Sequence, residues 1–288
     1  METKKRLSYD FRFLIITSIP LLIFIIISTI LHHLYPQILK VPDVRGPYLM
    51  ENILVDLLVM DIGSIIIASL VLYHGIKTEK NGLFKLTCFL NGSIIFTGLE
   101  ECYWIISGRF GAVPFGTYFF TKGGLWFLEI PLYTCLGWFA LAWCCVYISH
   151  TIFPNRNYIF HSIIAGLMAV SFDFFIDPVM VNLGTASIFP DSAGMWVWLT
   201  DPNISLSIFS IPFFNFFGWF LVIALFALLY GFTLTDEKIE KRGKTKSALI
   251  FFLLIPVFLG ICIGTIFLVS NIINPLFAGI NILPVGWV

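Results

Sequence analysis

Seven long apolar runs, separated by short polar intervals, dominate the hydropathy pattern of the chain. A helix needs about 20 residues to cross the apolar core of a bilayer, and each run is long enough. The strands of a membrane barrel would be shorter and would alternate apolar with polar residues. The pattern therefore predicts an all-α, polytopic membrane helix bundle with spans at 13–34, 53–74, 86–106, 125–148, 159–181, 211–233 and 247–271.

The first run follows three basic residues, Lys4, Lys5 and Arg6, as the apolar part of a signal peptide would. Its apolar stretch is longer than that of a signal peptide, and no small-residue cleavage pattern follows it. We therefore expect a retained first helix. The sequence predicts one integral membrane domain over residues 1–288, without an internal repeat.

Basic residues concentrate in alternate intervals, which sets the expected orientation. Cytoplasmic loops of membrane proteins are rich in Lys and Arg. Most of them lie before the first run and after the second, fourth and sixth, and the other intervals hold only Lys40, Arg45, Arg109 and Lys122. The prediction is a multi-pass protein of the cell membrane with a cytoplasmic N-terminus. Residues 272–288 are too short to cross and are expected at the outer interface or re-entering.

The composition narrows the function classes. Hydrophobic residues make up 58% of the chain and charged residues 12%, and the formal net charge is zero. A soluble domain is typically about 25% charged, so an ordinary soluble domain, a disordered chain and a nucleic-acid binder are excluded. The seventh run has no Lys for a retinal Schiff base, and no histidine cluster typical of a membrane di-iron enzyme occurs.

Acidic residues inside the apolar runs are the main candidates for chemistry. An ionised carboxylate at the centre of a membrane helix costs about 2.5–3.5 kcal/mol on insertion scales. With the predicted orientation, all of these acids fall in the outer half of the membrane, whereas a channel or pump needs polar steps along its whole depth. The pattern favours one acidic chamber, formed by Asp56, Asp61, Glu100, Glu101, Glu129, Asp173 and Asp177.

The spacing of two of these acids points to acid–base work. Asp173 and Asp177 lie one helical turn apart and share a helix face. Two close carboxylates in a low dielectric do not both ionise easily, so the pair offers one proton donor and one base. The rival use is a divalent cation, which would need several more oxygens. Pro178 predicts that the helix breaks or ends there.

Aromatic residues crowd the level of the acids. They form either an interfacial belt or a cavity whose π faces hold a polyene and stabilise a cation. Asn215, on the same helix face as Trp219, either positions a water or makes an interhelical hydrogen bond. The aromatic candidates are Trp104, Phe115, Tyr118, Trp126, Tyr133, Trp196, Trp198, Phe214 and Trp219.

Several ordered motifs resemble a known family. They are Glu100-Glu101, GRFGAVPFGTYFFTKGG (108–124), EIPLY (129–133) with Trp138, SFDFFIDP (171–178), WVW (196–198) and IPFFNFFGW (211–219). Together they resemble the CruF-type carotenoid hydratases, which include the bisanhydrobacterioruberin hydratases. The resemblance covers residues 98–220, which is therefore the expected active-site region.

The resemblance implies a reaction and a site. The family adds water to the terminal isoprenoid double bond of an acyclic carotenoid, giving a tertiary alcohol without a redox cofactor. The implied catalytic core is Asp173, Asp177, Glu101 and Asn215, and the implied lining is Tyr118, Trp196, Trp198 and Trp219. From their position in the chain, we add Phe115, Trp104, Asp61 and Glu129 as candidate substrate contacts. No metal or other cofactor is expected.

The expected partners are a carotenoid or polyprenoid substrate, water, the lipid bilayer and other membrane enzymes of the carotenoid pathway. Two alternatives remain at this point: a non-catalytic member that binds or moves a polyprenoid, and a cation- or proton-coupled transporter. The chain also departs from the family pattern between Asp177 and Trp196 and in the turn after Trp198. These departures leave open the substrate and the number of ends that are hydrated.

Overall fold

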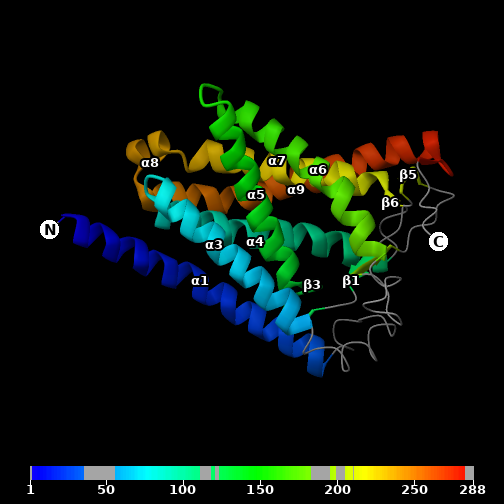
Figure 1. Ribbon diagram of the computed structural model, residues 1–288, viewed down its shortest axis with the longest axis horizontal. Helices are drawn as coiled ribbons and strands as arrows, with labels where there is room; N and C mark the ends of the chain where they lie inside the picture. The colour runs from blue at the N-terminus through cyan, green and yellow to red at the C-terminus, as the bar shows by residue number, and fades with distance from the viewer. Residues whose placement is uncertain are drawn as a thin grey trace.

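A computed structural model describes residues 2–35, 56–110, 118–120, 123–182, 195–198, 205–209 and 211–282. Within these ranges seven helices are long and apolar enough to cross a membrane, which confirms the predicted seven-helix bundle (Figure 1). Its helices are α1 (Glu2–Leu34), α3 (Ile62–Thr78), α4 (Gly82–Arg109), α5 (Leu132–Ile152), α6 (Tyr158–Asn182), α7 (Phe213–Thr233), the short α8 (Asp236–Arg242) and α9 (Lys244–Phe277).

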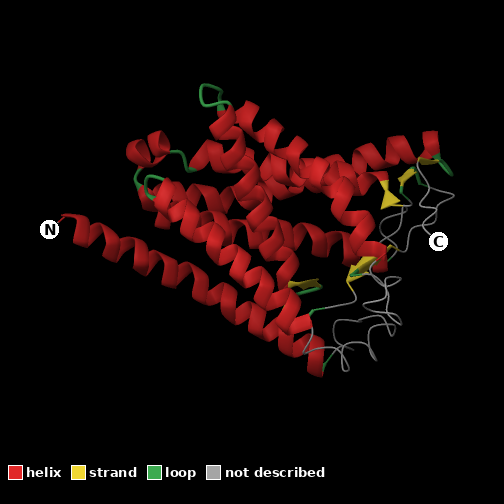
Figure 2. Cartoon of the chain, viewed as in Figure 1, coloured by secondary structure: helices red, strands yellow, loops and turns green. Residues whose placement is uncertain are grey.

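Short strands gather at one end of the bundle, which we call the strand end (Figure 2). A π-helical turn, η2 (Asp56–Asp61), precedes α3. The strands are β1 (Tyr118–Phe120), β2 (Trp126–Phe127), β3 (Ile130–Pro131), β4 (Trp196–Trp198), β5 (Ser207–Ile208), β6 (Ile211–Pro212) and β7 (Asn281–Ile282). β1 pairs antiparallel with β4, so a segment after α4 meets a segment after α6.

Helix α4 lies at the centre of the bundle. In its most apolar stretch of 18 residues, 78% is buried, whereas the corresponding stretch of α1 is 11% buried. Its Phe89 ring contacts the rings of Phe139 and Trp143 on α5 and of Phe226 and Tyr230 on α7. Because α4 packs in this way, its side chains face residues of both α5 and α7.

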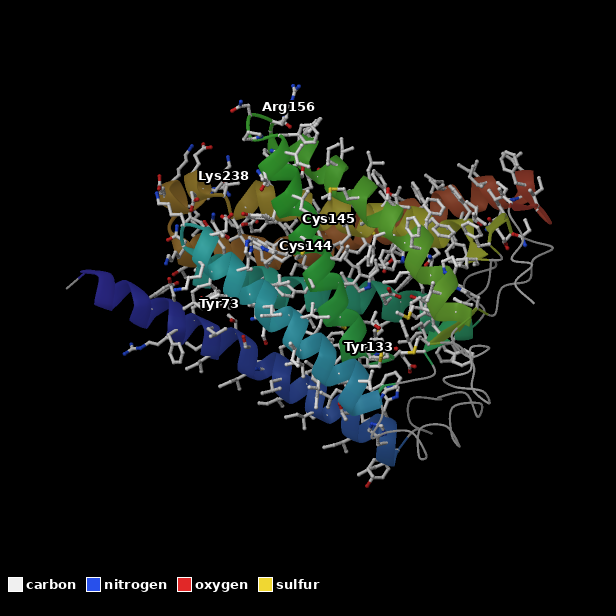
Figure 3. The ribbon with its side chains drawn as sticks, viewed as in Figure 1. Tyr73, Tyr133, Cys144, Cys145, Arg156 and Lys238 are labelled. Atoms are coloured by element: carbon white, nitrogen blue, oxygen red, sulfur yellow. The ribbon has the colours of Figure 1, made fainter. Side chains whose placement is uncertain are left out.

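Charged groups hold the opposite end together, which we call the ionic end. Lys85, only 3% exposed, bonds Glu79 at 2.9 Å and Asp236 of α8 at 3.0 Å. Lys244 bonds Asp10 at 2.7 Å and so ties α9 to α1. Figure 3 shows Arg156 and Lys238 away from the strands as well. The two ends of the bundle therefore differ in chemistry.

The predicted starts of the fourth and sixth helices are wrong. The fourth apolar run begins as a hairpin, in which β2 pairs with β3, and α5 begins only after Pro131. The sixth run starts two residues before its helix, with β6, whose partner β5 precedes the run, and α7 starts after Pro212. Proline is tolerated at a helix start but biases the residue before it to extended backbone. Apolar hairpin residues extend both runs beyond the helices.

The two hairpins belong to an internal repeat. The prediction that the chain contains no internal repeat is therefore also wrong. IPLYTCLGW (130–138) and IPFFNFFGW (211–219) share Ile, Pro, Gly and Trp at matching positions. Leu128 and Phe209, three residues before each proline, both have left-handed backbones with φ of 53° and 54°. Each hairpin is followed by a helix of 21 residues. The segment α4-β1-β2-β3-α5 thus corresponds to α6-β4-β5-β6-α7.

Two further predictions of helix ends are wrong. Pro178 does not end its helix, because α6 continues to Asn182 with this proline inside it. The last helix also outruns its predicted end at 271. It reaches Phe277 and contains both Pro256 and Pro275.

Candidate active site

Asn215 binds the two aspartates of α6 at once. Its side-chain Nδ2 donates to Asp173 Oδ2 at 2.9 Å and to Asp177 Oδ2 at 2.6 Å. Both aspartates are buried, and they share a face because they lie one helical turn apart. Asn215 is the third residue of α7, directly after the β5–β6 hairpin. The hairpin therefore sets where the amide meets the carboxyl groups.

Two glutamates of α4 approach the same region. Glu101 accepts a hydrogen bond from Trp138 Nε1 at 3.0 Å, and Glu100 accepts one from Trp104 Nε1 at 2.6 Å. Asp173 and Asp177 both interact electrostatically with Glu101. The fold thus brings together three carboxyl groups that α4 and α6 carry far apart in the sequence.

A cavity of about 350 Å³ opens beside these acids. Asp177, Glu101 and Asn215 line it together with the hydroxyl residues Ser64 and Thr134, while Asp173 is not among its lining residues. The Trp196 side chain bonds Asp177. The remaining wall is apolar and aromatic, made mainly by Tyr118, Phe120, Tyr133, Trp138, Trp196, Trp198 and Trp219.

A second, smaller cavity of about 30 Å³ adjoins the first. Glu101, Asn215 and Trp219 line both cavities, and Glu100 lines only the smaller one. A water needs roughly 10–15 Å³ of such space and two to four polar partners. The smaller cavity therefore has room for a water beside two carboxyl groups.

Three buried polar atoms near the cavities have no hydrogen-bond partner among the described residues. They are Asp173 Oδ1, Thr134 Oγ1 and the indole Nε1 of Trp198. Buried polar groups of folded proteins are normally paired, with protein or with water. These atoms are available to a water or a substrate group. In the described ranges no three His, Cys, Asp or Glu side chains could hold a metal ion together.

Comparison with known families decides the class of the chain. The sequence pattern of the carotenoid biosynthesis protein family matches residues 58–285, which is most of the chain. The chain belongs to the carotenoid biosynthesis protein family. Comparisons with curated proteins and with solved structures gave no significant match.

The predicted residues of this carotenoid biosynthesis protein fall into three groups. Tyr118, Trp196, Trp198 and Trp219 line the larger cavity with all the catalytic candidates except Asp173, and Trp104 lines the smaller one. Two acids lie elsewhere. Asp61 accepts hydrogen bonds from the backbone of Gly124 and Leu125 at 2.8 and 3.1 Å, and Glu129 lies in the turn between β2 and β3.

The prediction for Phe115 falls outside the described residues, as do the side chain of Asp56 and most of the divergent stretch after α6. Sequence reasoning also missed cavity residues of α5, among them Thr134, Gly137 and Trp138. Trp138 entered only as part of the family resemblance. The signal that could have found them is the repeat, because they match Asn215, Gly218 and Trp219.

Proposed function

We propose that this carotenoid biosynthesis protein is a hydratase. It adds water across the terminal isoprenoid double bond of an acyclic carotenoid and produces a tertiary alcohol. One observation carries the proposal: Asn215 holds two buried carboxyl groups, and one of them, Asp177, lines an aromatic cavity together with a third carboxyl, Glu101. Membership of the family supports a role in carotenoid biosynthesis.

Asp177 is the proton donor in this proposal. It lines the cavity, whereas Asp173, one helical turn earlier on the same face, does not. A carboxylic acid that an apolar site keeps neutral is able to act as an acid. Its proton goes to the less substituted carbon of the double bond, and the π electrons of that bond form the new C–H bond. The other carbon becomes a tertiary cation.

The cation then takes up water. The indole rings of Trp138 and Trp219 lie with centroids 4.2 Å apart in the cavity wall, and aromatic faces stabilise cations. A water from the smaller cavity attacks the cation, and Glu101 accepts the proton that this water loses. That proton returns to Asp177 before the next turnover, so the net change is the addition of one water without oxidation or reduction.

Asp173 and Asn215 are positioning residues. Asn215 gives both of its amide hydrogens to the aspartate pair and fixes the side chain of Asp177 toward the cavity. Asp173, buried and with one oxygen unpaired among the described residues, provides a second carboxyl group for sharing the proton.

Expression in a host that accumulates lycopene or bisanhydrobacterioruberin tests the proposal. Pigment masses are read by mass spectrometry after extraction. The hydratase predicts products heavier than the precursor by one or two waters. If well-folded protein gives no such product from either precursor, the proposal is wrong and a non-catalytic polyprenoid-binding protein becomes the better description.

A further inference from the structure

The two cavities occupy equivalent places in the two halves of the repeat. Five residues of α5 line the larger cavity, and the five residues at the matching positions of α7 line the smaller one. These sets are Tyr133, Thr134, Gly137, Trp138 and Leu141 against Phe214, Asn215, Gly218, Trp219 and Val222. Each cavity also has a carboxyl group of its own, Asp177 of α6 in the larger and Glu100 of α4 in the smaller, while Glu101 of α4 lines both.

Helix α9 accounts for the difference in size. It packs on α7 and α4, and its Ile266 lines the smaller cavity. A methyl group added at Gly218 would lie 3.6 Å from Ile266 Cδ1, whereas one added at Gly137 would meet nothing within 4 Å. On the other side of the bundle α3 packs on α5 and α4. Its Ser64 and Ile67 line the larger cavity, but none of its atoms lies within 4 Å of a methyl group added at Gly137.

One face of α5 is uncovered. Gly137, Leu141, Cys144 and Ile148 follow helical spacing along one face and are exposed or half-exposed; we call them the α5 strip. At the matching positions of α7, Gly218, Val222 and Leu229 are buried. From Gly137 to Ile148 the α5 strip runs about 16 Å at 1.5 Å per residue.

We propose that the polyene chain of the substrate lies on the α5 strip, in the place that α9 takes in the other half, and that its end enters the cavity past Gly137. The inference rests on the proposed hydratase function. It adds the path that the polyene takes to the cavity and names Gly137 as the residue that lets the chain enter. The occupant is a long apolar chain, because the α5 strip is apolar and continuous with the cavity that holds Asp177.

The volume of the larger cavity and the exposure of two of its lining residues support this arrangement. A volume of about 350 Å³ is at the small end for ligand pockets, which run from about 300 to 1,000 Å³. It holds an end group, and the rest of a carotenoid must lie outside. Ile67 of α3 and Phe172 of α6 line the cavity but are 57% and 46% exposed, so the cavity opens sideways toward lipid. Figure 3 shows Tyr133 nearer the strand end of α5 and Cys144 farther along it.

The test compares a long and a short substrate on a Gly137→Leu variant in detergent or nanodiscs. The substrates are lycopene and geraniol, which carry the same isopropylidene end. Leucine at 137 fills the mouth, so kcat/KM for lycopene should fall at least about tenfold relative to kcat/KM for geraniol. Gly264→Leu is the matched control, because Gly264 is also an exposed helical glycine with nothing within 4 Å of an added Cβ.

Each outcome of this test either supports or overturns the proposal. A selective loss for lycopene in Gly137→Leu, with wild-type rates in Gly264→Leu, supports the proposal, and Gly137→Ala should show a smaller loss of the same kind. Equal rates with wild type on lycopene, or an equal loss on both substrates, would overturn it while leaving the hydratase function in place. A wild-type protein that hydrates neither substrate would overturn the function and this inference together.

Discussion

Trp138 donates a hydrogen bond from its indole Nε1 to Oε1 of Glu101 at 3.0 Å. The bond joins α5, just beyond the first hairpin, to the central helix α4. Both residues line the larger cavity. The bond therefore fixes the carboxyl group of Glu101, which we assign as the base. The indole ring of Trp138 that makes the bond is itself part of the cavity wall.

Trp138→Phe should lower the hydration rate while leaving the cavity wall aromatic. A hydrogen bond to a charged group is worth about 1.5–3 kcal/mol, so losing the donor predicts a fall in kcat of roughly tenfold to a hundredfold. KM should change little, because the apolar contact remains. The rate of hydration of the carotenoid by purified protein measures both constants.

Trp143→Phe is the control for that substitution. Trp143 lies on the same helix and is buried, but its Nε1 has no hydrogen-bond partner among the described residues. Removing this donor should leave kcat unchanged. If Trp138→Phe is as active as Trp143→Phe, the indole donor does not position the base.

Asn215→Leu should remove most activity. Leucine has a similar size but no donor, so Asp173 and Asp177 lose the group that holds both. Leaving buried polar groups unpaired costs about 1–3 kcal/mol each, and we expect kcat to fall at least about a hundredfold. Asn271→Leu serves as control, since the exposed side chain of Asn271 donates to a carbonyl of its own helix, that of Phe267. Similar activity in both variants would refute the positioning role.

Lys85→Met should destabilise the ionic end without changing the candidate active site. Lys85 is buried and bonds two carboxylates, so its removal should cost about 2 kcal/mol, the size of charged hydrogen bonds. Lys80→Met should cost no more than about 0.5 kcal/mol, because the Lys80–Glu240 pair is 60% exposed on both sides. Thermal unfolding in detergent measures the difference. A larger shift for Lys80→Met would contradict it.

Orientation is predicted from the basic residues of the ionic end. With a cytoplasmic N-terminus, the turn between α5 and α6 lies inside and the end of α9 lies outside. In intact cells, a membrane-impermeant maleimide should label Ala278→Cys but label Arg156→Cys only after lysis. Both positions are exposed. Labelling of Arg156→Cys alone in intact cells would reverse the orientation.

Hydropathy predicted the spans because a bilayer forces backbone hydrogen bonds into helices. It failed at Pro131 and Pro212, since hairpins made of Trp126, Phe127 and Ile130 are as apolar as the helices that follow. The spacing of Asp173 and Asp177 predicted their shared face. Their meeting with Glu101 depends on how α4, α6 and α7 pack, which no local pattern encodes. Trp138 was indicated by the family resemblance, and its match to Trp219 in the repeat points to it as well.

The central claim is that Asp177 gives its proton to the carotenoid. The most direct measurement follows hydration of lycopene by purified wild type and Asp177→Asn in deuterated water. Wild type should form the tertiary alcohol with one deuterium on the neighbouring carbon, and Asp177→Asn should be slower by about a hundredfold to ten-thousandfold, the usual contribution of a general acid. Full activity in Asp177→Asn would contradict the account.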